Sequence, residues 1–303
     1  MTEKSFIQRN ILIPATICAL LWGSAIPVVK TGYSWLEIQD VFAKFAFAGY
    51  RFALAGLMIL AFMKFKKQSI KAEKDSWKAI ILICLVQTLF QYVFYYLGVG
   101  NTSGVRGSIL SATSTFFSVI IAHFVFASDK ITVKKLAGCI VGFAGVVVML
   151  SGSGLGSEQI KLTGEGFMLL SALGQGIGAV VSRKVATGRN PMLLTGWQLL
   201  IGGLVLTLIG VLGGGNIHMS LKGSILLLYL AMLSAVAFTV WTMLLKHHNV
   251  AKVTIYMFLV PVFGSLFSAF ILKEQVLTLR NIISLVLVCI GIFFVNRVEK
   301  VQN

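Results

Sequence analysis

The sequence predicts an all-α integral membrane protein with ten transmembrane helices, arranged as two inverted five-helix repeats. Three observations predict this class: an apolar composition, ten apolar runs of spanning length, and a matching order of residues in the two halves. Of the 303 residues, 57% are hydrophobic and only 12% are charged. Soluble domains carry about 25% charged residues, so too little polar surface is present to cover a water-soluble globule. The apolar content also excludes a disordered chain.

The positive charge and the cysteines do not indicate other classes of protein. The net charge is +16, but the positive residues lie between apolar runs rather than in a basic, aromatic-interleaved domain, which argues against a nucleic-acid partner. No pair of cysteines has metal-ligand spacing, and no phosphate-binding G-x-x-x-x-G-K-[ST] motif occurs. We therefore expect no metal and no cofactor. The cysteines lie far apart inside apolar runs, where thiols behave as small hydrophobes: Cys18, Cys84, Cys139 and Cys289.

Ten apolar runs are long enough to cross a bilayer, which takes about 20 helical residues. They lie at 11–30, 41–63, 78–98, 104–126, 133–151, 164–184, 192–212, 223–245, 251–272 and 279–296. The connectors between them are short, so no soluble domain is expected. The first run is also compatible with a signal peptide, but it is longer than a signal h-region and continues through Trp22, Pro27 and Lys30.

The Lys and Arg residues alternate between the connectors. With the N-terminus inside, 18 of the 26 Lys and Arg residues fall on the cytoplasmic side and 7 on the external side. The connector at 64–78 supplies a third of the inside total. Because the bias of short-loop Lys and Arg sets orientation, we predict a multi-pass protein with both termini in the cytoplasm. The short loops favour a plasma membrane.

The two halves, residues 1–151 and 164–303, align span for span about a linker at 152–163. The matched pairs are Trp22 with Gln175, Tyr50 with Trp197, Gly56 with Gly203, Tyr95 with Trp241, and Asp129 with Glu274. Since each half has an odd number of spans, the second copy enters the membrane from the other side. Inverted repeats in transporters place a substrate site near the midplane between them. A duplicated bundle without a transport role is the alternative.

Four short stretches recur in the order and spacing of a known family. They are Trp22-Gly23-Ser24 with Lys30, Arg51-Phe52, Tyr96-Leu97-Gly98 into Thr102-Ser103-Gly104, and Pro261 with Glu274. Over nearly its full length the chain resembles the EamA-type branch of the drug/metabolite transporter superfamily. The resemblance implies a ten-helix carrier for small metabolites or drugs, often an exporter, with a central cavity. The chain departs in the fourth span, where Thr115-Phe116 replaces the usual proline and the acidic residue is Asp129 rather than Glu.

Polar and aromatic residues inside the spans are the candidates for a substrate site, because a polar group in hydrocarbon is costly without a partner. Gln87, Gln91 and Tyr95 share one helix face, which favours either a wet cavity or hydrogen bonding between helices. Aromatic rings offer flat apolar surface and cation–π capacity, and amides orient polar groups. The predicted substrate-binding residues are Trp22, Gln91, Tyr95, Gln175, Trp241 and Tyr256.

Three ionisable residues and one proline complete the candidate site. Arg51 lies near mid-depth of the second span, where an anion contact and an interhelical lock are both open. His123 and Glu165, near span ends, are the candidates for proton coupling, with interfacial or packing roles as the alternative. Pro261 predicts a kink in the ninth span and is the candidate gating residue.

Together these features predict a secondary transporter that moves a small metabolite or drug by alternating access, with export as the expected direction. An amino acid or a similar amphipathic solute fits the aromatic residues, as does a cationic drug, whereas Arg51 favours an anion. The alternatives are a facilitative exchanger without proton coupling, a channel, and a non-transport protein such as an intramembrane enzyme. No H-E-x-x-H motif or intramembrane Asp is present, so we do not expect an enzyme. The expected partners are the substrate and the lipid bilayer, in a monomer or homodimer.

Overall fold

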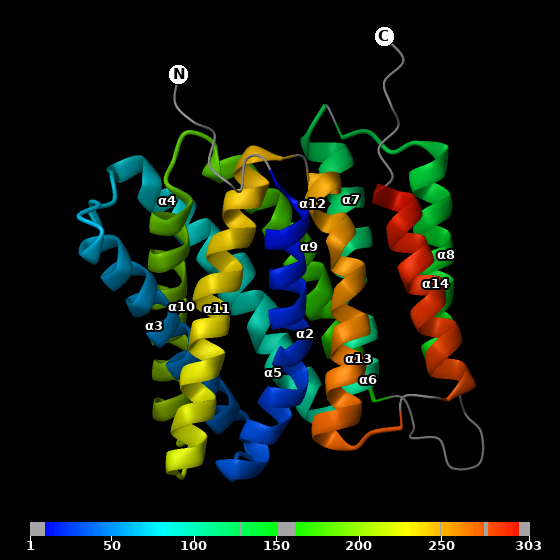
Figure 1. The fold of residues 1–303 in the computed structure, drawn as a ribbon. Helices are drawn as coiled ribbons and strands as arrows, with labels where there is room; N and C mark the ends of the chain where they lie inside the picture. The colour runs from blue at the N-terminus through cyan, green and yellow to red at the C-terminus, as the bar shows by residue number, and fades with distance from the viewer. Residues whose placement is uncertain (1–9, 128, 151–160, 249, 276–277, 297–303) are drawn as a thin grey trace.

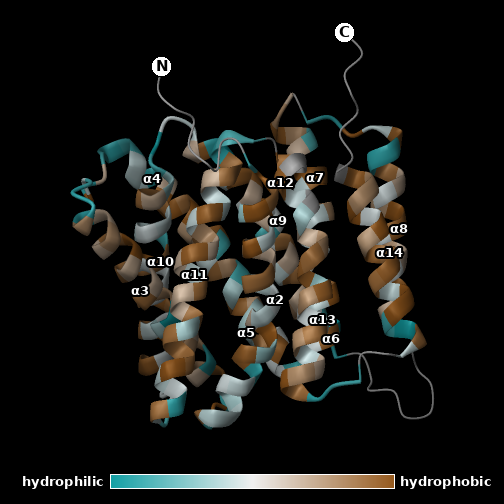
Figure 2. Ribbon diagram, viewed as in Figure 1, coloured by the Kyte–Doolittle hydropathy of each residue, from teal (hydrophilic) through white to brown (hydrophobic). Residues whose placement is uncertain are grey.

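The described part of the chain is helical throughout, apart from turns and short connections. The computed structural model describes residues 10–127, 129–150, 161–248, 250–275 and 278–296. Within them, seven helical segments are long and apolar enough to cross a membrane. Hydrophobic residues dominate along the bodies of the helices, and hydrophilic residues gather at the two ends of the bundle (Figure 2). The all-helical class predicted from composition is therefore confirmed.

The ten predicted spans are all present. The first half contains α2 (Leu12–Trp35), α3 (Val41–Phe65), α4 (Lys74–Ile83) continued by the π-helix η1 (Cys84–Phe90) and α5 (Gln91–Asn101), α6 (Gly104–Ser111) followed by α7 (Ser114–Val125), and α8 (Val133–Leu150). The second half contains the π-helix η2 (Leu162–Gly166) with α9 (Phe167–Ala186), α10 (Pro191–Leu212), α11 (Leu221–His247), α12 (Val250–Thr254) with the 3₁₀-helix η3 (Ile255–Phe258) and α13 (Leu259–Leu272), and α14 (Leu279–Asn296). Most of the predicted linker at 152–163 lies outside the described residues.

Short polar side chains set the starting points of several helices. The carboxylate of Asp40 accepts a hydrogen bond of 2.8 Å from the backbone N–H of Ala43 at the start of α3. Ser103 and Ser220 cap α6 and α11 in the same way. Asn190 caps α10, whose first residue is proline. These side chains satisfy backbone N–H groups that have no partner within the helix, which fixes where each span begins.

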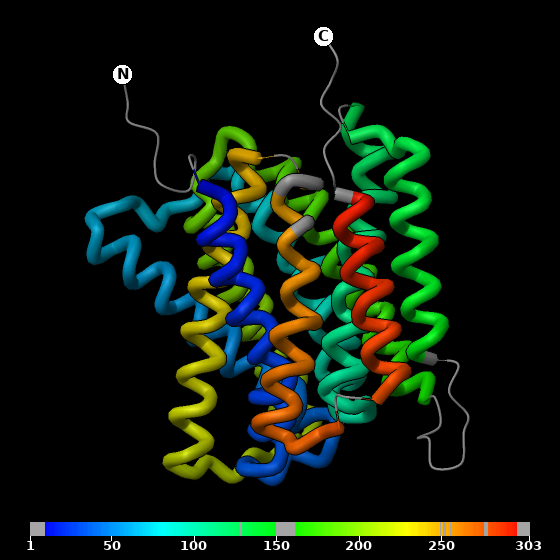
Figure 3. Tube along the Cα trace, turned by 45° about the vertical axis from the view of Figure 1, so that its right-hand side comes forward, coloured from blue at the N-terminus to red at the C-terminus, as the bar shows by residue number. Residues whose placement is uncertain are grey.

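Helix neighbours repeat between the two halves. α3 packs on α10 and α8 on α14, while α2 contacts α11 and α13 just as α9 contacts α5 and α7. Exchanging the halves converts each pairing into another observed pairing, as expected for inverted repeats. α2 begins and α14 ends at the same end of the bundle (Figure 1), which we call the terminal end, and the opposite end is the far end. Figure 3 shows α8 and α14 paired at one side of the molecule.

These pairings divide the helices into two bundles and two flanking pairs. The α2 bundle consists of α2, α11 and the interrupted helix α12–η3–α13. The α9 bundle consists of α9, the interrupted helix α4–η1–α5, and the broken helix α6–α7. The pairs α3–α10 and α8–α14 flank the two bundles. Each bundle contains the repeat counterparts of the other, so the space between them lies on the axis that relates the halves.

Where α3 and α10 cross, exchanging the two halves also converts one contact between single residues into another. A Cβ atom built on Gly49 would lie 2.7 Å from the carbonyl oxygen of Gly203, and one on Gly56 would lie 2.7 Å from that of Gly196. With the alignment found in the sequence, Gly49 is the counterpart of Gly196 and Gly56 that of Gly203. The two contacts are therefore one contact repeated by symmetry. Small residues at such a crossing allow close backbone approach.

Two spans that are repeat counterparts are interrupted at matching depth. α6 ends at Ser111 and α7 begins at Ser114, with the Thr113 hydroxyl donating 2.6 Å to the carbonyl of Leu110. In the second half, η3 precedes Pro261, whose ring cannot donate to a carbonyl four residues earlier and crowds it. The kink predicted at Pro261 stays a prediction, because η3 is a change of helix type that ends before Pro261. The fourth span breaks without a proline, because hydroxyl side chains satisfy the freed backbone.

Candidate functional site

Two small cavities lie between the α2 bundle and the α9 bundle, about halfway along the helices. Both are lined by Trp22, Gln91, Ser114, Gln175 and Met257. The interruptions of α6–α7 and α12–η3–α13 border these cavities. Broken helices are tolerated at membrane depth where they line a cavity, and in transporters they form the substrate site. Because the cavities are small, the bundles are closed around them in this structure.

Five of the six predicted substrate-binding residues line these cavities. Trp22, Gln91 and Gln175 border both, Tyr95 borders the larger cavity, and Trp241 borders the smaller one. The repeat counterparts thus come from opposite bundles: Trp22 faces its counterpart Gln175 across the same space. The alignment of the halves therefore identified residues that border the same cavities.

Tyr256 is the predicted substrate-binding residue that lines neither cavity. It lies on η3, partly buried, and packs against the apolar cluster that contains Trp241. The neighbouring residue Met257 borders both cavities instead. The change from α to 3₁₀ geometry at η3 alters which side chain faces inward, and the sequence gives no signal for this change beyond Pro261.

The α2 bundle contributes an aromatic wall. The ring centroids of Trp22 and Trp241 are 5.0 Å apart at an interplanar angle of 71°, and those of Trp22 and Phe238 are 5.8 Å apart at 78°. Edge-to-face contacts of this kind fix the rings against one another. Met257 and Val260 extend the apolar surface. This side of the cavity therefore suits the apolar part of a solute.

The α9 bundle contributes a polar wall opposite. Gln87 accepts a hydrogen bond of 3.2 Å from Ser182, so this glutamine also joins two helices. The side-chain oxygens of Gln91 and Thr115 are buried and have no hydrogen-bond partner among the described residues. An unpaired buried polar group costs about 1–3 kcal/mol. A molecule bound in the cavity would offset this cost by supplying the missing partner to these two atoms.

The π-helix η1 lies within the polar wall. It covers Cys84–Phe90 and includes Gln87, and Gln91 follows as the first residue of α5. A π-helical turn holds one more residue than an α-helical turn and is found often at functional sites. Gln87 and Gln91 both border the smaller cavity, as their spacing on one helix face predicts.

Arg51 reaches the larger cavity from α3, between the two bundles. Its side chain is buried, with 1% of the residue exposed. The Nε atom donates 2.8 Å to the hydroxyl of Ser234, and Nη1 donates 3.1 Å to the hydroxyl of Tyr96. A charge at the bilayer centre costs at least about 2.5–3.5 kcal/mol on insertion scales. The guanidinium therefore needs the cavity, the neutral partners or a bound anion to offset that cost.

His123 and Glu165 lie away from both central cavities. The Nδ1 atom of His123 accepts a hydrogen bond of 2.9 Å from the backbone N–H of Ile131, at the terminal end of α7. The carboxylate of Glu165 accepts hydrogen bonds from the Thr102 hydroxyl at 3.0 Å and from the Lys161 backbone N–H at 2.9 Å. Pro261 is buried within α13. These three residues act at the ends or in the backbone rather than on the central space.

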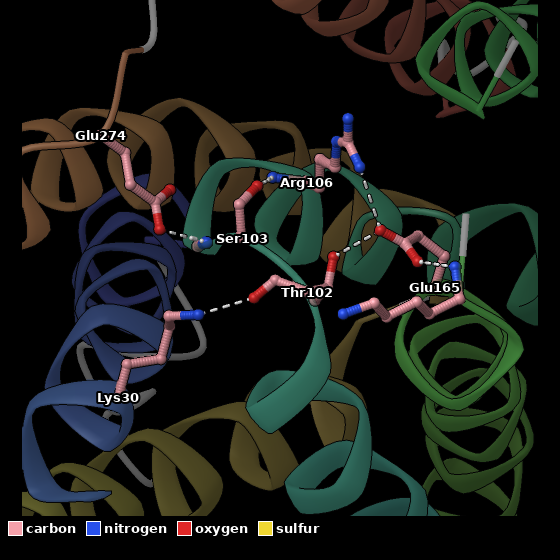
Figure 4. A network of polar contacts seen from close by, with 8 residues as sticks. Lys30, Thr102, Ser103, Arg106, Glu165 and Glu274 are labelled. Atoms are coloured by element: carbon pink, nitrogen blue, oxygen red, sulfur yellow. Dashed lines mark hydrogen bonds and ion pairs between the residues drawn. The ribbon is translucent and has the colours of Figure 1, made fainter. Parts of the chain in front are cut away.

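A polar network joins the two bundles at the far end (Figure 4), where Lys30, Thr102 and Glu274 also border a further cavity. The carboxylate of Glu274, which follows α13, accepts hydrogen bonds of 2.8 and 3.0 Å from the first two N–H groups of α6, on Gly104 and Val105. The ammonium of Lys30 on α2 donates 2.6 Å to the carbonyl of Thr102. Both contacts join the α2 bundle to the α9 bundle. The positive end of the helix dipole stabilises a carboxylate placed beside it, so Glu274 strengthens the contact between the two bundles at the far end.

Sequence reasoning did not assign a role to Lys30 and Glu274. The signal was present in the repeat alignment. Lys30 lies eight residues after Trp22, and Arg183 lies eight residues after Gln175, the counterpart of Trp22; Glu274 is matched with Asp129. At the terminal end the carboxylate of Asp129 forms an ion pair with the guanidinium of Arg183. This pair lies within the α9 bundle, between α9 and the connection that follows α7.

The comparisons with known proteins agree with this architecture. The model of the EamA-like transporter family matches residues 10–151 and 162–297. A WAT1-related chloroplastic protein of Arabidopsis thaliana is 27% identical, over 97% of this chain and 70% of that protein.

Two microbial proteins named as transporters also align with most of the chain. One from Archaeoglobus fulgidus is 26% identical over 88% of this chain and 90% of its own length. YoaV of Bacillus subtilis is 24% identical over 90% and 92%. A solved crystal structure with 16% identity superimposes with a TM-score of 0.68, covering 94% of this chain and 95% of that chain. This last likeness concerns the fold.

Proposed function

Because the chain belongs to the EamA-like transporter family, we propose that it is a secondary transporter that carries a small amphipathic solute, such as an amino acid, through the central space by alternating access. The observation that carries this proposal is the two-faced cavity. An aromatic wall from the α2 bundle faces a polar wall from the α9 bundle, with unpaired oxygens on Gln91 and Thr115. A solute with an apolar part and a polar part fits between them. The enzyme alternative is set aside by the family match.

The two bundles supply the movement. In the described structure the far end is fastened by Glu274 and Lys30, and the cavities are closed around their lining residues. Release of these contacts opens the far end, and rocking of one bundle against the other closes the terminal end. In each of the pairs α3–α10 and α8–α14, the two helices are repeat counterparts that contact one another. These two pairs stay in place as the frame. With both termini in the cytoplasm, the far end is external, and export is the expected direction.

Exchange without proton coupling is the second candidate mechanism. Among the described residues that line the two central cavities, none is an Asp, Glu or His. Proton-coupled carriers use an intramembrane group that gains and loses a proton. His123 and Glu165 lie outside these cavities, so a proton would have to act at a distance from the solute.

Flux into proteoliposomes tests the proposal and separates the two mechanisms. Purified protein is reconstituted, and uptake of radiolabelled L-leucine, L-methionine and L-phenylalanine is measured with and without an imposed proton gradient. We expect saturable uptake that is accelerated by unlabelled amino acid on the opposite side. Uptake that is unchanged by the gradient identifies exchange or facilitated transport. No saturable flux of any of the three contradicts the proposed substrate class.

The aromatic wall makes a matched pair of variants possible. Trp241→Ala removes a buried ring from the cavity, whereas Trp35→Ala removes a ring that is 49% exposed at the far end of α2. Losing a cavity ring removes apolar contact of at least about 1.5 kcal/mol, or about tenfold in affinity. We therefore expect uptake to fall about tenfold in Trp241→Ala and to stay near the unmodified level in Trp35→Ala at matched expression. Equal uptake by the two variants removes Trp241 from the site.

A further inference from the structure

Arg51 is a buried cation whose partners in the described structure are all neutral. Its Nε and Nη1 atoms donate to the hydroxyls of Ser234 and Tyr96. Its guanidinium carbon lies 5.0 Å from the ring centroid of Phe52 and 5.9 Å from that of Tyr92. Arginine stays protonated in proteins, so these contacts hold the guanidinium in place without neutralising its charge.

The carboxylates of the described residues are committed elsewhere. Glu165 pairs with Arg106 and Asp129 with Arg183, at opposite ends of the bundle. Glu274 caps α6, and Asp40 caps α3. Glu37 lies at the far end beside His218. The remaining two, Glu73 and Asp75, flank the start of α4. Within the described part of the chain, therefore, no carboxylate forms an ion pair with Arg51.

The larger cavity supplies no negative side chain to balance Arg51. None of its described lining residues is an Asp or a Glu. The guanidinium retains further N–H donors in a planar fork that matches a carboxylate. A positive group with free donors therefore borders a cavity that holds no acidic side chain among its described lining residues.

From this geometry we propose that Arg51 is the residue that selects a substrate with a carboxylate group, such as a zwitterionic amino acid, by binding that carboxylate. The inference rests on the proposed transport function and sharpens it, because the aromatic wall alone admits cationic solutes whereas Arg51 rejects them. The unpaired oxygen of Gln91, in the same cavity, then accepts a hydrogen bond from a donor on the substrate. The substrate class is a small amphipathic carboxylate with an amino or hydroxyl donor.

Equilibrium binding to the purified protein in detergent tests this assignment without requiring translocation. The probes are L-leucine, L-methionine and L-phenylalanine, each compared with its carboxamide, which keeps the amine and the side chain but lacks the negative charge. We expect the unmodified protein to bind at least one acid more tightly than its amide by about tenfold or more, the ratio for a bidentate charge-assisted pair. In Arg51→Gln this preference should disappear, and in Arg51→Lys it should be reduced but present.

Folding is followed by elution profile and melting midpoint. Ser234→Ala serves as a second variant that leaves the charge and removes one anchor of the guanidinium. It should retain a preference for the acid, with weaker binding. The proposal is overturned when the unmodified protein shows no preference for any acid, or when folded Arg51→Gln keeps it. It is also overturned when Arg51→Lys and Ser234→Ala lose affinity for acid and amide equally, as a purely structural lock requires. Because binding is measured apart from flux, a failed transport assay leaves this result interpretable.

Discussion

Gly203→Ala is expected to lower the melting midpoint of the purified protein, although alanine is the better helix former. The added Cβ atom would lie 2.2 Å from the backbone nitrogen of Ala53 and 2.8 Å from its Cα. Backbone atoms in a helix cannot move aside cheaply, and overpacking costs about 1–3 kcal/mol or more. Since α3 and α10 cross here and form part of the frame, the whole bundle should be affected. Fluorescence-detected size-exclusion chromatography after heating measures the change.

Gly107→Ala is the matched control. A Cβ atom at Gly107 would meet its nearest neighbours, on Ile26 and Thr102, at 3.4 Å, which is an ordinary contact. Helix propensity then favours alanine by up to about 1 kcal/mol. The control should melt at or above the temperature of the unmodified protein. A midpoint for Gly203→Ala equal to that of Gly107→Ala would contradict the close crossing of α3 and α10.

Glu274→Ala is expected to loosen the far end and to reduce transport by a large factor. The variant leaves the N–H groups of Gly104 and Val105 without their carboxylate. It also removes a contact between the two bundles. Removing a helix cap costs about 0.5–2 kcal/mol, which shifts the balance between closed and open far ends by up to about thirtyfold. Uptake into proteoliposomes should fall because the closed state is less populated.

The control for this prediction is Glu37→Ala, at the same end of the bundle. The Glu37 side chain is 73% exposed, and its partner His218 is 67% exposed, so this pair contributes little. Uptake by Glu37→Ala should match that of the unmodified protein. If Glu274→Ala transports as well as Glu37→Ala, the far-end network does not take part in closure.

The architecture could be predicted from the sequence because the features that indicate it occur many times along the chain. Apolar runs of spanning length recur ten times, and matched residues such as Trp22 and Gln175 recur at the same place in each half. These patterns reflect burial in lipid and a duplicated unit, both of which act along the whole chain. From the same patterns, five of the six predicted substrate-binding residues were chosen correctly as residues that line the central cavities.

What could not be predicted depends on local geometry and on contacts between distant segments. The 3₁₀-helix η3 changes which residues face inward, so Met257 rather than Tyr256 borders the cavities. The fourth span breaks without proline because its hydroxyl groups satisfy the backbone. The link from Glu274 to α6 spans 170 residues, and no local pattern marks it.

Access to the central cavity from each side of the membrane is the most direct measurement of the central claim. Ser171, which borders the larger cavity from α9, is replaced by cysteine in a protein whose four native cysteines are replaced by alanine. A membrane-impermeant methanethiosulfonate is then applied to one side or the other of uniformly oriented proteoliposomes. Alternating access predicts modification from both sides, slowed by a transported amino acid. Modification from one side only, unaffected by solute, would contradict it.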